Sequence, residues 1–549
     1  MKHLKKIMSL ILTAIMVIAM CVPVMAEGGS ATYSLTIKGD KANHTYKAYQ
    51  IFSGKLHVEG EDKILSDITW GNGVSESART SLGNAEDTAK RLTTEGESYA
   101  KALAKQLVET KGYLGTMAAS VSVSDDSTRD SDGKYVYVIN GLTPGYYLVT
   151  DTLTSGQTDD AISDYIVQIV GNATVAAKVA KPSVDKQVWD ETSDAEEGHD
   201  NGWGESADHA INETFQFKLK ATLPVNDNYD SYTSYMVKFN DTMSRGVTFE
   251  SIDSVKITCG GGTYTIDKGT DKNNEPGKYF AEGINEENKA GLTWSLEIPN
   301  LKAVSDKINL KVGATIEVIY SAHLNENAVV SNATGTQIKT NSNKVDLEYS
   351  NNPNGTGTGK TEEDYVWVFT YEVDNTKVNG SITNNDGTHP ALSGAKFKLF
   401  DSTGKNEIGL VSDTIHDTNT NTDKKVYRPT KGNERAEEMV SGDGDGKFNI
   451  IGLDAGIYIL RETEAPSGFN KCEDITITIS AQHVEDTTKG ANLNLTKSQN
   501  MTNTIEDKKG STLPETGGIG TTIFYVVGVV LMLGAGVLLI TKRRMSAKH

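Results

Sequence analysis

The sequence predicts an all-β protein built from several domains in tandem. The chain has 549 residues, which is too many for one core of ordinary size, so two to four domains are expected. Its long stretches rich in Thr, Val, Tyr and Asn are typical of β-structure. Residues 141–152 and 452–463 are also similar, since each has a glycine-bearing turn that leads into a strand. Two related β-domains near opposite ends of the chain follow from this similarity.

The charge and the cysteine content argue against nucleic-acid binding and against a disulfide-stabilised fold. The formal net charge of -19 argues against a nucleic-acid partner, because neutralising phosphates requires clustered Lys and Arg. Cys259 and Cys472 lie more than 200 positions apart, and the third cysteine falls in the N-terminal segment described next. A disulfide framework is therefore not expected, and the folded chain needs another source of stability.

Residues 1–26 have the features of a secretory signal peptide. Three lysines precede an apolar run at 7–20, and the small residues around Ala26 suit a signal peptidase. We therefore expect an exported protein from which this segment has been removed.

The C-terminus carries a three-part pattern. An apolar stretch at 523–540 is long enough to span a bilayer as a helix, and a basic cluster at 542–544 follows it. A pentapeptide precedes both, formed by Leu513, Pro514, Glu515, Thr516 and Gly517. This order resembles the sorting signal of Gram-positive wall proteins. The resemblance implies that a sortase cleaves after Thr516 and holds it as a thioester until an amine attacks.

Composition and strand patterns divide the chain between its ends. We predict domains at 27–180, 181–360 and 361–510, followed by the sorting region at 511–549. The first domain contains a small helical insertion, because five apolar residues fall on one face of a 3.6-residue period. These residues are Ala100, Leu103, Ala104, Leu107 and Val108.

Several motifs resemble a known family. Residues 184–188, 239–242 and 347–353 resemble the middle domain of backbone pilins, and residues 458–469 resemble their E-box. Phe469 stands where Tyr is commoner. The resemblance implies tandem immunoglobulin-like β-sandwiches of the collagen-adhesin B type. It also implies an internal amide in such a domain, between a Lys near the first strand and an Asn or Asp near the last, assisted by a buried acid.

Elementary chemistry explains the buried acid. An amine attacks a carboxamide only when it is uncharged, and burial lowers the pKa of Lys while it raises that of Asp or Glu. A neutral amine beside a protonated acid can then exchange protons during the reaction, with proximity in place of an enzyme.

Strand alternation selects residues for the middle domain. Val184, Lys186 and Val188 share one strand face, while residues 345, 347, 349 and 351 share another. We predict an amide between Lys186 and Asn351 with Asp241 as the acid. Asn352 is the alternative, because a bulge would shift the parity.

In the third domain we predict an amide between Lys377 and Asp507, with Glu462 at the catalytic position of the E-box. Asn503 is the alternative partner. Amide formation with Asp507 releases water, whereas with an asparagine it releases ammonia. In the first domain Asp151 matches Glu462, and Lys38 and Asn172 are the candidate partners. We do not expect an amide there, because charged residues at such positions are more often exposed.

Polymerisation needs an exposed amine as well. The family places it near the end of the first domain, after alternating apolar residues and Pro. Residues 173–178 follow this pattern with Ala177 in place of Pro, so we predict Lys178 and keep Lys181 as the alternative. Acidic stretches at 125–132 and 443–446 suggest calcium loops, but neither has the following Glu of an EF-hand. No cofactor is expected.

The combined hypothesis is a non-enzymatic shaft subunit of a sortase-assembled surface pilus, secreted and anchored to peptidoglycan. Its expected partners are copies of itself, a pilin-class sortase, the peptidoglycan precursor, minor pilins and a host surface ligand. The alternative is a monomeric wall-anchored adhesin that binds a host matrix protein.

Overall fold

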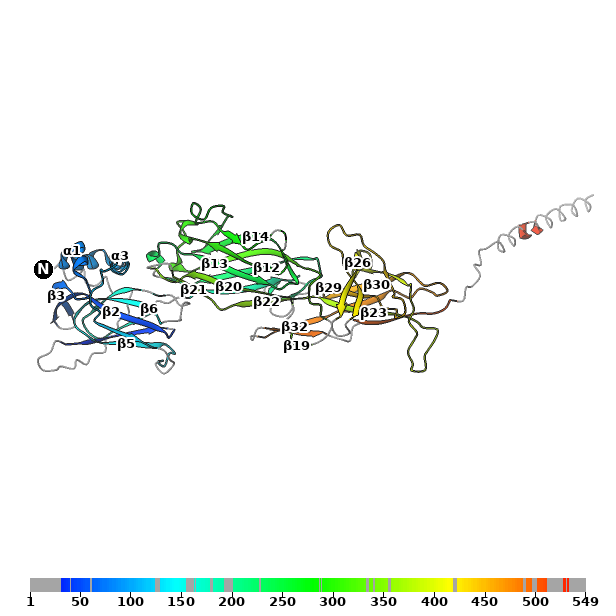
Figure 1. Ribbon diagram of the computed structural model, residues 1–549, viewed down its shortest axis with the longest axis horizontal. Helices are drawn as coiled ribbons and strands as arrows, with labels where there is room; N and C mark the ends of the chain where they lie inside the picture. The colour runs from blue at the N-terminus through cyan, green and yellow to red at the C-terminus, as the bar shows by residue number, and fades with distance from the viewer. Residues whose placement is uncertain are drawn as a thin grey trace, which may run out of the picture.

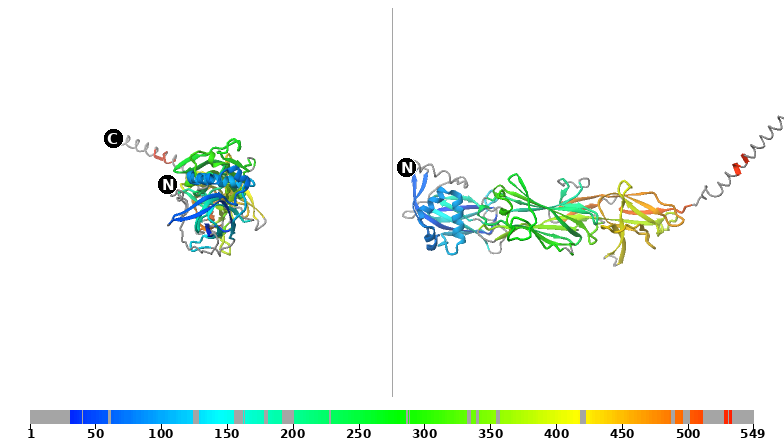
Figure 2. Two further views of the ribbon diagram at one scale, coloured as in Figure 1. Left: turned by 90° about the vertical axis from the view of Figure 1, so that its left-hand side faces the viewer. Right: turned by 90° about the horizontal axis from the view of Figure 1, so that it is seen from above.

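Strands make up most of the fold, and they form three parts that follow one another along the longest axis (Figures 1 and 2). The computed structural model describes residues 31–510, 527–529 and 531–532, with gaps in the first range. The gaps are residues 40, 60–61, 124–128, 155–161, 163, 178–180, 192–200, 227–228, 286, 288, 332–334, 339–340, 354–356, 418–421, 487–489 and 496–500.

The first part is a two-sheet sandwich. One sheet has the order β5-β1-β8 and the other β3-β2-β6-β7, with β4 paired to β2. Alternate residues of both sheets, such as Leu35, Tyr137 and Val149, fill the core between them. The strands are β1 (Tyr33–Gly39), β2 (His44–Glu59), β3 (Asp62–Trp70), β4 (Ala119–Ser122), β5 (Tyr135–Leu142), β6 (Gly145–Leu153), β7 (Tyr165–Ile169) and β8 (Ala173–Ala176).

The helical insertion lies between β3 and β4 and is larger than the sequence predicted. The described residues form α1 (Glu76–Leu82), α2 (Ala85–Thr94) and α3 (Gly96–Glu109), of which only α3 was expected. The Ser75 and Asn84 side chains cap α1 and α2 by accepting backbone N–H groups. Leu103 and Leu107 of α3 are buried as predicted, in a second core that all three helices share with the five-stranded sheet.

The middle part is the largest sandwich. A six-stranded sheet has the order β10-β9-β12-β18-β14-β15, and it faces a sheet with the path β11-β22-β20-β13-β17-β16, to which β21 adds. Residues of β12 alternate between buried and more exposed positions, as a strand with one face on a core requires. Its strands are β9 (Ser183–Trp189), β10 (Trp203–Gly204), β11 (Ser206–Asp208), β12 (Thr214–Leu223), β13 (Val237–Met243), β14 (Val247–Cys259), β15 (Gly262–Thr265), β16 (Phe280–Glu282), β17 (Thr293–Ile298), β18 (Ala314–Leu324), β20 (Asn341–Ser350), β21 (Thr358–Lys360) and β22 (Asp364–Phe369), with short 3-10 turns at Tyr229–Ser231, Leu301–Ala303 and Leu310–Val312.

The third part repeats the two-sheet plan. Its sheets have the orders β26-β27-β29-β23-β34 and β25-β24-β30-β31, with β28 paired to β24. The first and last strands of this part, β23 and β34, are parallel neighbours. Its strands are β23 (Tyr371–Asn379), β24 (Lys396–Phe400), β25 (Glu407–Ile408), β26 (Leu410–Asp417), β27 (Thr422–Pro429), β28 (Met439–Val440), β29 (Asn449–Leu453), β30 (Gly456–Glu464), β31 (Ile475–Ile479), β32 (Ala481–Asp486), β33 (Gly490–Leu495) and β34 (Thr502–Asp507).

Two elements join the middle and third parts. β22 pairs with β20 and β11 of the middle sheet, and its side chains serve both cores, with Val366 and Val368 in one and Trp367 and Phe369 in the other. β19 (Gly335–Ile338) also pairs with β33 of the third part. The predicted limit between residues 360 and 361 therefore falls just before a strand that both parts share.

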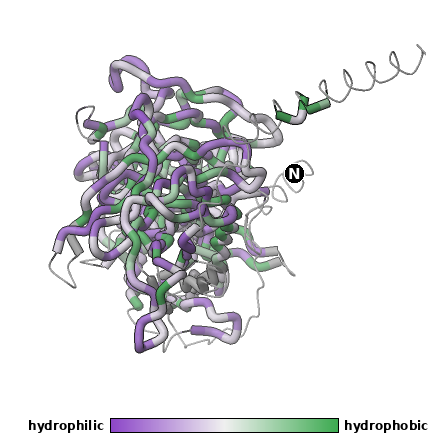
Figure 3. Tube along the Cα trace, turned by 90° about the vertical axis from the view of Figure 1, so that its right-hand side faces the viewer, coloured by the Kyte–Doolittle hydropathy of each residue, from purple (hydrophilic) through white to green (hydrophobic). Residues whose placement is uncertain are grey.

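The two ends of the chain contribute little to the described structure. Residues 1–26 lie outside it, and so does most of the predicted membrane helix at 523–540. The described residues of that stretch are hydrophobic except for one glycine (Figure 3). Within the described part of the chain, no helix has the length and apolar character needed to cross a membrane.

Candidate crosslinking sites

A lysine and an aspartate meet in the core of the middle part. Lys186 on β9 and Asp241 on β13 are fully buried, and the Lys186 Nζ atom contacts the Asp241 Oδ2 atom. Rings of Phe217 and Tyr320 lie 5.2 and 5.3 Å from the amine. Burial lowers the pKa of Lys186 and raises that of Asp241. Both shifts favour the uncharged forms.

Three more side chains complete this site. The Tyr320 hydroxyl lies 3.0 Å from both the Lys186 amine and the Asp241 carboxylate, and the Trp294 Nε1 group donates to Asp241 at 3.2 Å. Asn343 on β20 is fully buried, and its amide donates to the Tyr320 hydroxyl at 2.6 Å. The Asn343 Oδ1 atom has no hydrogen-bond partner among the described residues. An amine, an acid and a carboxamide thus share one phenolic oxygen.

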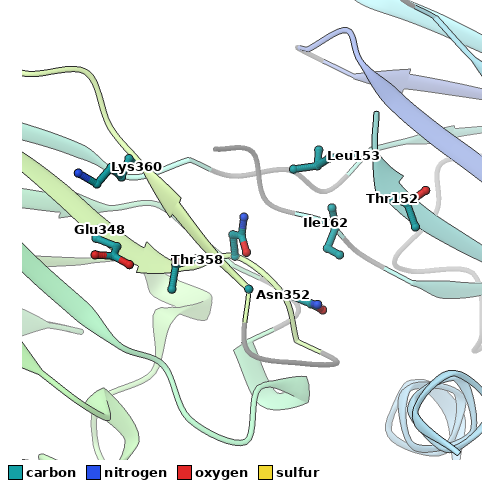
Figure 4. A pocket seen from close by; sticks show the side chains of 9 residues that line it. Thr152, Leu153, Ile162, Glu348, Asn352, Thr358 and Lys360 are labelled. Carbon is teal, nitrogen blue, oxygen red and sulfur yellow. The ribbon is translucent and has the colours of Figure 1, made fainter. Parts of the chain in front are cut away.

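The structure places Asn351 away from the Lys186 site. Asn351 follows the end of β20, and it lines a hollow of about 610 Å³ between the first and middle parts, together with Asn352 (Figure 4). Its backbone accepts a hydrogen bond from Ile162 of the first part at 3.0 Å. In the register of β13 and β20, Asp241 pairs with Val345. Asn343 is one alternate position from Val345, whereas Asn351 is three alternate positions from it in the other direction.

The alternation rule found the buried face of β20, but it selected a residue at the far end of the strand from Asn343. Residues 343, 345, 347, 349 and 351 are all buried, as that rule requires. The position along the strand is fixed by the antiparallel register with β13, which the sequence does not reveal. The signal for Asn343 was therefore present, since it shares the parity of Val345.

The third part contains a second buried lysine with two acids. Lys377 on β23 lies 2.5 Å from the Asp507 Oδ1 atom on β34 and 3.4 Å from the Glu462 Oε1 atom on β30, and all three side chains are fully buried. The Glu462 Oε2 atom accepts the backbone N–H of Cys472 at 2.7 Å. Burial raises the pKa of Asp507 to about 6. The structure thus brings together the three residues selected for this domain.

Asn503, the alternative partner, is engaged elsewhere. Its amide donates to the Asn375 side chain at 2.9 Å. Asn375 precedes Lys377 by two residues on β23, so both lie on the same face of the strand. Asp507 therefore is the acceptor that the lysine meets. The Phe397 ring lies 5.3 Å from the amine, so this site has an apolar wall like that of the middle part.

Comparison with known families identifies three matching segments of the chain. Residues 211–353 match a family described as Gram-positive pilin backbone subunit 2, Cna-B-like domain, and residues 505–546 match the LPXTG cell wall anchor motif. The chain belongs to the Gram-positive backbone pilins. Residues 378–494 of this pilin also match a prealbumin-like fold domain. Its anchor motif assigns the pilin to the cell wall.

Individual relatives are distant. The trypsin-resistant surface T6 protein of Streptococcus pyogenes serotype M6 is 24% identical over 430 residues, which are 70% of the pilin and 72% of that protein. The solved T6 backbone pilin is 17% identical, with 87% and 98% of the two chains covered and a TM-score of 0.47. The major pilin SpaD of Corynebacterium diphtheriae is 15% identical, with 88% and 99% covered and a TM-score of 0.44.

The first part of the pilin has the same strand plan as the third, which allows its positions to be compared. In both parts the first strand pairs antiparallel with a strand that ends in a glycine bulge, and parallel with the last strand. This register places Asp151 at the position of Glu462, and Gly39 at the position of Lys377. Lys38 is one residue out of phase, and its amine forms a salt bridge of 2.7 Å with Asp130.

The acid of the first part has a different partner. The Asp151 carboxylate contacts the His44 Nδ1 atom at 2.8 Å, and both side chains are buried. Asn172 accepts the backbone N–H of Ser34 at 3.0 Å. Lys38, Asp151 and Asn172 therefore do not meet, because a histidine fills the space beside the acid where the third part has its lysine.

The intermolecular residues lie outside the described structure. This holds for Lys178 and for the pentapeptide at 513–517, including Thr516, whereas Lys181 is described just before β9. Their roles stay predictions.

Proposed function

We propose that this backbone pilin forms the shaft of a pilus and is stabilised by two internal amide bonds, Lys186 with Asn343 and Lys377 with Asp507. The observation that carries the proposal is a fully buried amine in each of two sandwiches, close to an acceptor and an acid. A buried lysine of this kind is costly unless it is paired or consumed.

In the middle part the uncharged Lys186 amine attacks the Asn343 carboxamide carbon. The new C–N bond forms as the bond to Nδ2 breaks, and Asp241 gives a proton to the leaving nitrogen and recovers one from the amine. The products are a secondary amide and one ammonia. Tyr320 contacts the amine, the acid and the carboxamide, so it holds the reacting groups in place.

In the third part the same attack occurs on the protonated Asp507 carboxyl group. Glu462 moves the proton, and one water leaves instead of ammonia. The raised pKa of Asp507 supports this step, because a neutral carboxylic acid accepts an amine whereas a carboxylate does not.

The positions of the bonds suit a subunit under tension. We infer that a neighbouring subunit is joined at Lys178, with Lys181 as the alternative, and that the pilin's own Thr516 joins the next. Tension then enters near residue 178, crosses from β9 to β20 through the first amide, and crosses from β23 to β34 through the second. Most strands of both sandwiches are bypassed, so a pull need not separate the sheets.

This load path accounts for the uncrosslinked first part. Residues 27–177 lie on the N-terminal side of the linkage lysine, so tension does not pass through them. The His44–Asp151 pair, which stands in place of a crosslink, therefore does not weaken the shaft. The sortase, the peptidoglycan precursor, minor pilins and a host surface ligand complete the proposal as partners, and the segment at 523–540 serves as the membrane helix before transfer to the wall.

The intact mass of the purified protein tests the two bonds. We expect it to fall below the mass calculated from the sequence by one ammonia and one water, and digestion to yield peptides joined through Lys186 with Asn343 and Lys377 with Asp507. Asn343→Ala should restore only the ammonia, and Asp507→Ala only the water. An unmodified mass for the parent protein contradicts the proposal, and a crosslinked peptide that contains Asn351 contradicts the assignment of Asn343.

A further inference from the structure

Three potential metal ligands converge where the middle and third parts meet. His209 and Glu213 lie in the segment between β11 and β12, and Asp454 lies in the turn between β29 and β30. Each offers one ligand atom, and these atoms lie within 4.8 Å of one another. The backbone holds the two segments together nearby, since the Ile211 N–H donates to the Gly452 carbonyl at 2.9 Å. In Figure 1, β29 lies on the side of the third part that faces the middle part.

Each of the three side chains is oriented by a contact of its other polar atom. The His209 Nε2 atom contacts the Trp189 carbonyl oxygen at 2.8 Å, and the ring stacks on Phe215 at 4.1 Å. Glu213 accepts the N–H of Ala210 at 2.9 Å, and Asp454 accepts that of Ala455 at 2.8 Å. Metal-binding histidines have this arrangement, in which the second ring nitrogen donates to a carbonyl or carboxylate.

The position of the His209 Nδ1 atom is the observation that points to a ligand. The side chain is 1% exposed, and Nδ1 faces the Glu213 Oε1 atom at 3.4 Å. With Nε2 directed at the Trp189 carbonyl, Nδ1 is the ring nitrogen that faces Glu213. The 3.4 Å between Nδ1 and Oε1 is longer than the roughly 2.7–2.9 Å of a charge-assisted hydrogen bond. One metal ion with bonds of about 2.0–2.1 Å to both atoms fits this separation at a tetrahedral angle.

The surroundings are rich in acidic side chains. Asp190 and Asp208 are buried beside the three ligands, and the Asp208 N–H donates to Asp190 at 3.1 Å. Buried carboxylates grouped in this way favour a bound cation.

We propose that His209, Glu213 and Asp454 bind one divalent transition-metal ion, with zinc the best match, and that this ion fastens the middle part to the third. One imidazole nitrogen and two carboxylates are a zinc donor set, to which a water adds a fourth ligand. Calcium prefers six to eight oxygens, which this set does not offer. The Glu213 side chain is 38% exposed and gives the ion and its water a path from solvent.

Metal binding by the purified protein tests the site. The protein is stripped with a chelator, dialysed against zinc or calcium, and assayed for bound metal and for zinc affinity by titration calorimetry. We expect one tightly bound zinc per chain, no comparable calcium, and a rise in the unfolding temperature with zinc. Asp454→Asn and Glu213→Gln, which keep the size of the side chains, should each weaken zinc binding by about tenfold or more.

Glu250→Gln is the matched control. Glu250 contacts the His323 Nδ1 atom at 2.8 Å, and this pair belongs to no group of three potential ligands in the described part of the chain. The Glu250→Gln variant should bind zinc as tightly as the parent protein. The proposal is wrong if the parent protein binds no zinc, or if Asp454→Asn binds it as tightly. In that case His209 is a protonated partner of Glu213. The mass losses that report the internal amides are measured separately, so an absence of zinc binding leaves the proposed function standing.

Discussion

Replacing Lys186 with methionine is expected to lower the free energy of unfolding of the middle part by about 5 kcal/mol, because the amide closes a loop of roughly 150 residues in the unfolded chain. That loss corresponds to a fall of about 10–20 °C in unfolding temperature for a domain of this size. Methionine suits the site, since the amine lies against the rings of Phe217 and Tyr320. Asp241 keeps the Trp294 and Tyr320 hydrogen bonds.

Calorimetry and intact mass together measure this effect. The variant should regain one ammonia relative to the parent, apart from the change of side chain, and keep the water loss of the third part. Asn351→Ala is the control, because Asn351 lies at the hollow between the first and middle parts. It should keep both the crosslink and most of the stability. An unchanged unfolding temperature in Lys186→Met argues against a bond at this lysine.

Replacing Lys178 with alanine is expected to abolish the covalent polymer. Wall extracts of cells that express the parent pilin with its sortase should give a ladder of high-mass species on denaturing gels, since amide bonds withstand boiling in detergent. The variant should give a single band, still attached to the wall through Thr516. The expected change is complete, because each subunit has one linkage amine under this assignment.

Lys181→Ala separates the two candidate lysines. It keeps a lysine at 178 and should leave the ladder intact, so the opposite pattern would move the linkage to Lys181. A single band from the parent pilin would instead favour the monomeric adhesin. Both lysines precede β9, where their loss should not disturb the buried amine of Lys186.

Sequence patterns predicted the buried face correctly in the strands at 184–188 and 345–351, where alternation is regular. Lys186, Val345 and Leu347 are buried as the period of two requires, and so is Leu107 of the helical insertion. The two short helices before it were missed, because their formation depends on caps and on packing against a sheet. Glu462 and Asp507, which the structure places beside Lys377, could be selected because the E-box and the sorting signal fix their positions along the chain.

The sequence by itself determined that this chain is exported, β-rich and equipped with a wall-sorting signal, since those properties depend on local composition and short motifs. Only the tertiary structure placed the Asn343 amide at the Tyr320 hydroxyl that also contacts Lys186. It alone showed that Gly39 and His44 of the first part stand where the third part has Lys377, and that Asp454 approaches His209. Each of these depends on the register between strands or on contact between separate parts. The physical reason is that register and docking are set by side chains distant in the sequence, whereas alternation and sorting motifs are local.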